Sequence, residues 1–402
     1  MVPTARVKLA HQAIIFLICS CFLFTASPAT LSLPVIDISR LFVEDIGHPD
    51  YVEVVDKIDD ALRRYGLFFA VGYSWKNTNL INFEAADALF KLPKVAKEDV
   101  SLLNSSNRGY IGFGKESGLI LDVFEPKEGF SYSYDWIDEV DGAKSNTMQG
   151  SNQWPRGLSQ EKITILDSFY LENANLARIL SNVLLGKLRE LDKGGLVSLD
   201  TTFASGGEKI SIMRIFHYFP APTVTEQRDD EKEKEKCMLG SAPHTDWGFL
   251  TIISQDDCGG LQLWVADEDE GSEGGGAFLD VPANLPGNPL VVNGGDYLSF
   301  LSSGRYLSPV HRVVSPKARE RTSFVFFSYP GFNSTIPEIK AKSGSNEKEK
   351  GPRTLPISIV FNTAEYVAGC FGDYILGKWK GVFSSPLSNT SSDSSEAERV
   401  EL

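Results

Sequence analysis

The spacing of apolar residues predicts helices in the first half of the chain. Apolar positions recur at helical spacing over residues 50–66 and again over 159–188, so each segment is predicted to form an amphipathic helix. Gly66 is the stop signal of the first helix. Short β-rich runs at 33–42 and 67–73 lie on either side of that helix and are predicted to be strands.

After about residue 205 the pattern changes to short β-rich runs bounded by Gly, Pro, Asp and Ser. These runs are 209–220, 248–255, 260–265, 289–302 and 321–330. Many short strands with turn signals between them are typical of a sandwich, a barrel or a jelly roll. The chain is therefore expected to be a mixed α/β protein with a mainly β core.

Polar low-complexity segments interrupt the β-rich half. Residues 226–236, 266–277 and 342–350 are too charged or too rich in glycine for a core, so each is predicted to be a solvated loop. The Ser-rich acidic tail, residues 384–402, is predicted to be disordered.

Composition limits the classes of partner. The 402-residue chain carries a formal charge of −14, which argues against nucleic acid or an anionic membrane surface. Its five cysteines form neither a disulfide framework nor a zinc pattern. No feature of the sequence indicates an oligomeric state.

The N-terminus resembles a targeting segment. Arg6 and Lys8 precede the apolar run 13–24, which is short for a membrane span of about 20 residues. Residues 1–29 are predicted to be a signal peptide cleaved near Ala29, with an uncleaved N-terminal anchor as the alternative. The expected destination is outside the cell or in the endomembrane lumen. Three N-x-S/T sequons fit this route, at Asn104, Asn333 and Asn389.

The segment APHTDWGFLTII, residues 242–253, contains the first candidate site residues. In an extended chain His244 and Asp246, two positions apart, project to one side. Alone, they fit a turn into a strand equally well. His311 is the candidate third ligand, and two imidazoles with one carboxylate suit Fe(II), with three coordination positions left open. Zinc accepts the same ligand set, so the triad does not name the metal.

A second candidate group follows ten residues after His311. Arg321 and Ser323 share a strand face, and a guanidinium with a neighbouring hydroxyl offers three donors to a carboxylate. Tyr218 is a further candidate donor, with a core tyrosine as the alternative. His217 is interpreted as structural, facing away from Tyr218.

Four further residues are assigned outside the site. Asn293 and Asp296 flank a Gly-Gly pair and are predicted to form a tight turn. Lys127 and Glu128 are interpreted as an ion pair. Trp247 is open to two interpretations, support of the metal ligands or core packing.

The order HTD, HRV and RTS resembles the Fe(II)/2-oxoglutarate dioxygenases of the isopenicillin N synthase-like group. The resemblance extends over residues 33–335. Its landmarks are LPVIDIS, RYGLFFAVGY, RGYIGFG, PKEGFSY, NQWP, QDDCGGLQLW and VVNGGDYLSFLSSGRY. The chain departs from the family at Val71-Gly72-Tyr73, where Asn-His-Gly is common, and at the charged insertion where a Pro-Pro-Cys-Pro turn often lies.

The resemblance implies a double-stranded β-helix (jelly roll) with helices packed outside it. Together with the N-terminal segment and the tail identified above, we expect five regions: 1–29 (signal peptide or anchor), 33–200 (helix-rich N-terminal region), 205–335 (jelly-roll core), 336–383 (C-terminal segment packing on the core) and 384–402 (tail). The resemblance also implies that His244, Asp246 and His311 hold Fe(II).

By the same resemblance, Arg321 and Ser323, assisted by Tyr218, bind the distal carboxylate of 2-oxoglutarate. The implied reaction consumes O₂ and 2-oxoglutarate, releases succinate and CO₂, and oxidises a small organic molecule. Related iron oxidases that do not use 2-oxoglutarate keep the same Arg-x-Ser pair and remain an alternative. A non-catalytic jelly-roll binding protein is a further alternative, which the intact triad disfavours.

Overall fold

The structure of the chain is a computed structural model. The residues that the structure describes are 32–43, 46–75, 79–102, 107–116, 123–136, 146–191, 210–220, 237–266, 276–335 and 369–383. The predicted signal peptide, the acidic tail and most of the three polar insertions lie outside these residues. Across the described segments, no helix has the length and apolar character needed to span a membrane.

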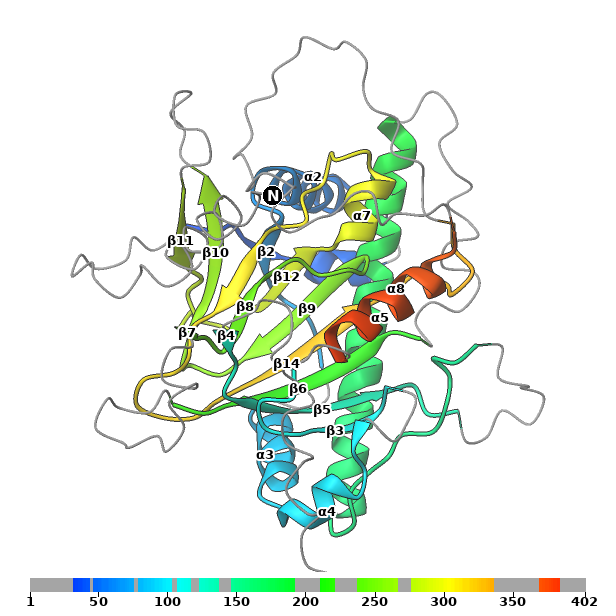
Figure 1. Ribbon diagram of the computed structural model, residues 1–402. Helices are drawn as coiled ribbons and strands as arrows, with labels where there is room; N and C mark the ends of the chain where they lie inside the picture. The colour runs from blue at the N-terminus through cyan, green and yellow to red at the C-terminus, as the bar shows by residue number, and fades with distance from the viewer. Residues whose placement is uncertain are drawn as a thin grey trace, which may run out of the picture.

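A large sheet of eight strands forms the centre of the molecule (Figure 1). Only β1 and β2 are parallel, and the other neighbouring pairs are antiparallel. In spatial order the strands are β1 (Val35–Asp37), β2 (Leu67–Val71), β12 (Leu290–Gly294), β9 (Leu250–Gln255), β14 (Arg321–Ser328), β6 (Ile212–Tyr218), β5 (Lys127–Ser133) and β3 (Gly109–Ile111).

Two smaller sheets complete the β structure. The four-stranded sheet has the order β11 (Gly276–Asp280), β10 (Leu261–Ala266), β13 (His311–Val313) and β8 (Ser241–His244). Short strands β4 (Val123–Phe124) and β7 (Cys237–Met238) pair in parallel. The division of the chain into five regions stays a prediction; the large sheet takes strands from both 33–200 and 205–335.

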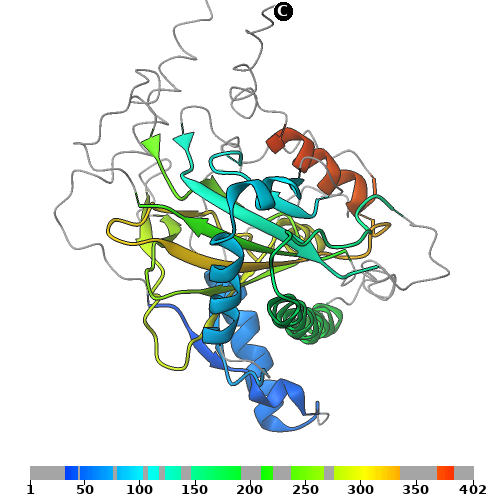
Figure 2. The same ribbon diagram turned by 90° about the horizontal axis from the view of Figure 1, so that it is seen from below.

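Helices cover both sides of the large sheet. In Figure 2 the long helix α5 (Gln160–Leu191) and the helix α8 (Phe371–Phe383) lie on opposite sides of it. The remaining helical elements are η2 (Ser39–Phe42), α2 (Pro49–Arg64), α3 (Asn79–Phe90), α4 (Lys94–Glu98) and α7 (Asp296–Leu301). Both predicted amphipathic helices are confirmed, and Gly66, with φ +71°, follows the first.

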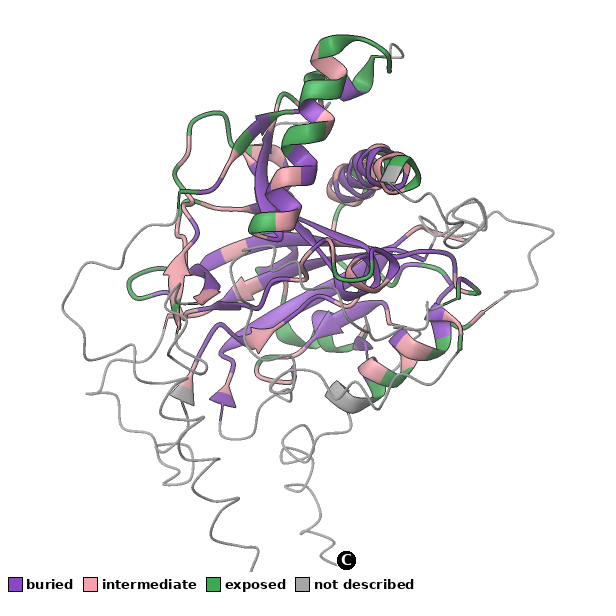
Figure 3. Cartoon of the chain, turned by 90° about the horizontal axis from the view of Figure 1, so that it is seen from above, coloured by how far each residue is buried: buried purple, intermediate pink, exposed green. Residues whose placement is uncertain are grey.

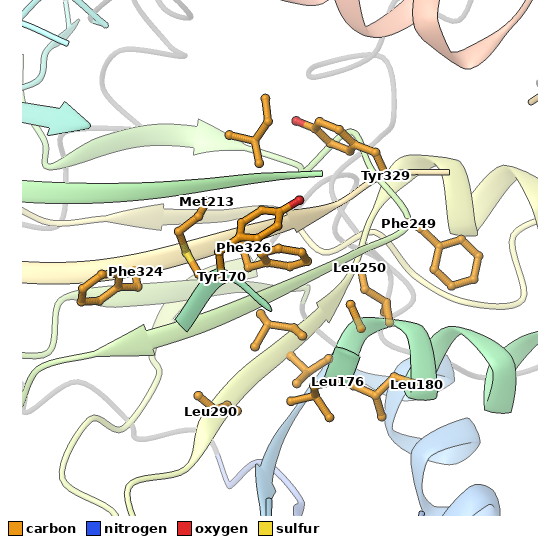
Figure 4. Packing of buried hydrophobic residues seen from close by; sticks show 14 of the residues in the cluster. Tyr170, Leu176, Leu180, Met213, Phe249, Leu250, Leu290, Phe324, Phe326 and Tyr329 are labelled. Carbon is orange, nitrogen blue, oxygen red and sulfur yellow. The ribbon is translucent and has the colours of Figure 1, made fainter. Parts of the chain in front are cut away.

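The side chains of β14 alternate between two buried environments. Phe324 and Phe326 pack in the same buried cluster as Tyr170 of α5 (Figure 4). Phe324 also meets Phe169 of α5, with 4.9 Å between ring centroids. Val325 points the other way, into the apolar layer between the two larger sheets. Strands buried on both faces carry few polar positions, and Figure 3 shows the large sheet buried along most of its length. Polar side chains on the face of the large sheet that meets the smaller sheet are therefore candidate site residues.

Two of the predicted strands are only partly strands. Residues 33–42 form the short β1 followed by the 3₁₀ turn η2. In 289–302 the strand β12 ends at Gly294 and the helix α7 begins at Asp296. A short apolar run does not distinguish strand from helix by periodicity, which explains the second difference.

Candidate active site

A cavity of about 110 Å³ lies between the two larger sheets, and His244, Asp246 and His311 face it. His244 is the last residue of β8, and His311 lies directly opposite it on β13. Asp246 lies two residues beyond the end of β8. The sequence prediction placed both His244 and Asp246 within one strand, which is not the case. Each histidine Nε2 lies 3.8 Å from one oxygen of Asp246. One donor atom from each residue falls within 4.8 Å of the others, so the three could hold one metal ion.

Hydrogen bonds fix how both imidazoles face the centre. His244 Nδ1 lies 2.7 Å from the carbonyl oxygen of Ala242, and His311 Nδ1 lies 3.0 Å from that of Pro309. Because a carbonyl only accepts, each Nδ1 is assigned the proton and donates it. Each Nε2 then offers a lone pair toward Asp246. This is the tautomer that a metal-binding histidine requires.

The electrostatics favour a neutral imidazole beside an ionised carboxylate. Burial and the neighbouring His311 lower the pKa of His244 to about 4. Burial raises the pKa of Asp246, but the two histidines and the hydrogen bond from Asn293 outweigh it, and the net shift is downward. Neutral histidines and a charged aspartate are the protonation states in which these side chains bind a divalent cation.

Asn293 and Asp296 do not form the predicted tight turn. Asn293 lies within β12 and donates from Nδ2 to Oδ2 of Asp246 over 2.8 Å. Asp296 begins α7, and its backbone N–H donates to the Asp246 carbonyl at 2.8 Å. The Gly-Gly pair is needed for close packing and not for a turn. Gly295 lies against the backbone of Gly248, and a Cβ on Gly295 would come within 2.2 Å of the carbonyl oxygen of Gly248. These glycines allow close backbone approach beside Asp246.

Arg321, Ser323 and Tyr218 lie together in the same cavity. Arg321 Nη1 donates to Ser323 Oγ over 3.2 Å, and Nη2 donates to Gln255 Oε1 over 3.0 Å. The guanidinium carbon lies 4.7 Å from the ring centroid of Tyr218, its cross-strand partner on β6. Arg321 Nε is buried without a hydrogen-bond partner in the described structure. The group therefore keeps donor capacity for an anion.

His217 and Tyr218 face opposite sides of β6, as predicted. His217 contacts two carboxylates away from the cavity, with Nδ1 at 3.0 Å from Glu128 and Nε2 at 3.0 Å from Glu320. The predicted ion pair between Lys127 and Glu128 is wrong, because adjacent strand residues also face opposite sides. Lys127 points into the cavity, whereas Glu128 pairs with Lys97 at 2.7 Å.

Further cavity residues were missed by the sequence argument. Trp247, which the sequence left open, lines the cavity with Tyr329 and with Trp379 of α8. The charged residues of the wall are Glu116, Glu125, Lys127 and Arg214. Of these residues, Arg214 was the one that the sequence could have indicated. Side chains alternate along β6, so Arg214 lies on the same face as Tyr218.

Comparison with known proteins agrees with this arrangement. Residues 209–330 match the family model of the 2OG-Fe(II) oxygenase superfamily, and residues 33–157 match the N-terminal model described as non-haem dioxygenase in morphine synthesis. A homoarginine-6-hydroxylase of Arabidopsis thaliana is 30% identical over 324 residues, covering 77% of this chain and 87% of the relative. The chain belongs to the 2OG-Fe(II) oxygenase superfamily.

This oxygenase has both curated relatives and structural neighbours. Clavatol oxidase of Penicillium crustosum is 28% identical, covering 79% of this chain and 91% of the relative. The crystal structure of a full-length Neurospora crassa protein in complex with alpha-KG matches with a TM-score of 0.60 at 20% identity, covering 88% of this chain and 97% of that one. A 2OG-Fe(II) oxygenase family protein of Caulobacter crescentus matches with a TM-score of 0.59 at 20% identity, covering 89% and 100%.

These matches confirm the expected family and the jelly-roll fold with flanking helices. The oxygenase is an oxidoreductase that uses Fe(II), 2-oxoglutarate and O₂ to oxidise a small molecule. The reaction couples that oxidation to decarboxylation of 2-oxoglutarate.

Proposed function

We propose that His244, Asp246 and His311 bind the Fe(II) of this oxygenase. Their convergence in one cavity is the observation that carries the proposal. The donor set fits the metal, because two neutral imidazoles and one carboxylate suit Fe(II) and leave positions open for other ligands. When bound, the iron activates O₂ and binds the keto-acid end of 2-oxoglutarate.

The proposal assigns the distal carboxylate of 2-oxoglutarate to Arg321 and Ser323. The guanidinium presents a planar fork, and Ser323 Oγ lies 3.2 Å from Arg321 Nη1, so both groups can donate to one carboxylate. The hydroxyl of Tyr218 is the third donor in this assignment. Burial strengthens these contacts, since Arg321 is 2% exposed and Ser323 1% exposed.

The rest of the cavity orients the substrate and excludes water. Trp247, Tyr329 and Trp379 supply apolar surface, and their enclosure keeps bulk solvent from the reacting atoms. Holding substrate and co-substrate in a fixed relative position lowers the entropic part of the barrier.

Anaerobic reconstitution tests the assignment. Purified protein is loaded with Fe(II) under nitrogen, 2-oxoglutarate is added, and the visible charge-transfer band of the chelate is recorded before O₂ is admitted. We expect the band and release of succinate, and we expect neither with His311→Ala. Retention of both in His311→Ala would overturn the metal assignment. Iron-dependent oxidation without succinate would favour an oxidase that does not use 2-oxoglutarate.

We further infer that the chain is directed to the secretory pathway. The basic residues Arg6 and Lys8, the apolar run 13–24 and the small residues before Ala29 support this inference. Asn333, which opens a sequon, is exposed and open to glycosylation. Expression of the full chain with a C-terminal tag tests it: secretion or a glycosidase-sensitive mass supports the inference, and an unmodified cytosolic protein starting at Met1 overturns it.

A further inference from the structure

A second arginine faces the cavity at a distance from Arg321. Arg214 lies on β6 with its side chain on the same face as Tyr218, four residues away. At about 3.3 Å per residue, this separation corresponds to roughly 13 Å along the strand. Cross-strand register agrees, because Tyr218 pairs with Arg321 and Arg214 pairs with Val325. The cavity therefore has one guanidinium near each end.

Arg214 leaves most of its hydrogen-bonding capacity unused. Its Nη1 donates to Oε1 of Glu116 in a short contact, and within the described structure the side chain makes no other hydrogen bond. A guanidinium carries five N–H donors, and the Arg214 side chain is 10% exposed. Arg214 lines the cavity, so its remaining N–H donors are suited to bind a ligand that accepts hydrogen bonds.

Glu116 has one oxygen that is ion-paired but accepts no hydrogen bond from the described residues. Its Oε2 is buried and has no hydrogen-bond partner in the described structure, although Lys127 Nζ lies 3.6 Å away. Lys127 donates instead to Glu125 at 2.6 Å. Glu125 in turn accepts from the backbone N–H of Ala242 at 2.7 Å, two residues before His244. Lys127 and Glu125 are thus each other's nearest charged partners, and Arg214 and Glu116 pair beside them on the same cavity wall.

Resting on the function proposed above, we propose that the primary substrate is a free amino acid. Its carboxylate receives hydrogen bonds from Arg214, and its ammonium group donates to Oε2 of Glu116. The wall cluster contains two acids and two bases, so its formal charge is zero. A zwitterion preserves that balance, whereas a simple carboxylate would lie against Glu116 and an amine against Arg214. A neutral molecule would add no charged partner to either group.

Succinate release from the full-length holoenzyme tests this proposal. The probes are the twenty protein amino acids and L-homoarginine, each added to enzyme with Fe(II), 2-oxoglutarate and O₂. At least one is expected to raise succinate release above the substrate-free rate, and thymine serves as a neutral comparison. Stimulation by thymine and by no amino acid would overturn the proposal. Absence of the Fe(II)–2-oxoglutarate band would instead remove the proposed function, and this proposal with it.

Derivatives of the best amino acid test each contact without altering the protein. Its carboxamide, lacking the anion, and its Nα-acetyl form, lacking the cation, are each expected to lose about ten-fold or more in kcat/KM. In Arg214→Gln, the ratio of kcat/KM for the free amino acid to kcat/KM for its carboxamide is expected to fall to about three-fold or less. In Glu116→Gln, the ratio of kcat/KM for the free amino acid to kcat/KM for its Nα-acetyl form is expected to fall to the same extent. Because ratios within one variant cancel general damage, unchanged ratios in both variants would overturn the assignment. Arg319→Gln, an exposed control, is expected to match wild type.

Discussion

Asn293 holds the carboxylate of Asp246 by a 2.8 Å hydrogen bond from Nδ2 to Oδ2, and the two side chains are 2% and 4% exposed. The other oxygen, Oδ1, faces His244 Nε2 at 3.8 Å. Oδ2 also faces His311 Nε2 at 3.8 Å, so the hydrogen bond from Asn293 fixes a carboxylate that both imidazoles face. Hydrogen bonds of this kind set the rotation of a carboxylate ligand and so its fit to the metal.

Asn293→Ala is therefore expected to lower Fe(II) affinity by about ten- to 100-fold, because Asp246 loses its orienting donor. Anaerobic titration followed by the 2-oxoglutarate chelate band measures this affinity. Asn175→Ala is the matched control, since Asn175 is exposed and its side chain accepts a hydrogen bond from the exposed Arg178 Nη2. Wild-type affinity in a folded Asn293→Ala protein would show that Asp246 is oriented by other groups.

Arg321→Lys retains the positive charge and removes the planar fork. We expect the KM for 2-oxoglutarate to rise by about ten-fold or more, because an ammonium cannot reproduce paired N–H donors to one carboxylate. Turnover at saturating 2-oxoglutarate should fall less than kcat/KM does. Arg319→Lys, two residues earlier and 55% exposed, should leave both constants at wild-type values. An unchanged KM in Arg321→Lys would place the 2-oxoglutarate carboxylate elsewhere.

The sequence predicted the residues that converge on the metal position, because strand alternation and a two-residue spacing are local properties. Arg321 and Ser323 share a face of β14 by this rule. His244 and Asp246 are two apart, but Asp246 lies beyond the end of β8, so alternation does not account for its position. Whether His311 lies opposite His244 depends on strand register across β13 and β8, which only the family resemblance supplied.

The supporting and wall residues could not be predicted for the same physical reason. Asn293 reaches Asp246 from a strand 47 residues later, and its Gly-Gly neighbours gave the signal of a turn. Glu116 meets Arg214 across 98 residues of sequence. Lys127 and Glu128 are adjacent in sequence, but strand alternation sends them to opposite faces, where each has another partner. Long-range contacts are set by tertiary packing, which single-sequence patterns do not encode.

Lys97 anchors a buried polar cluster on the outer side of the large sheet. Its Nζ lies 2.7 Å from Glu128 Oε2 and 2.8 Å from the carbonyl oxygen of Phe90, and the Lys97 side chain is 9% exposed. Lys97→Met is expected to destabilise the protein by about 1.5–3 kcal/mol, because Glu128 loses this charged partner and, among the described residues, keeps only Tyr110 and His217. Lys94→Met, at a side chain 80% exposed, should change stability by less than about 1 kcal/mol. Equal midpoints of urea unfolding for the two variants would contradict this account.

His217 should make stability depend on pH. Burial lowers its pKa, but the carboxylates of Glu128 and Glu320 outweigh burial and raise the pKa above the ordinary value of 6.5. A folded-state pKa above the unfolded one means that the folded protein binds the proton more tightly. The stabilisation is therefore fully present below pH 6.5 and is lost as the pH rises through the folded-state pKa. His217→Gln cannot titrate and should lack this component.

The measurement is the difference in Tm between wild type and His217→Gln at a series of pH values from about 5.5 to 9. The Tm of wild type should exceed that of His217→Gln most at the acidic end, and this difference should shrink with rising pH. Other titrating groups contribute equally to the Tm of both proteins. Glu320→Gln removes only the exposed partner and should give a smaller dependence, because Glu128 still holds the proton on Nδ1. A difference that stays constant across the series would show that His217 is neutral between the two carboxylates.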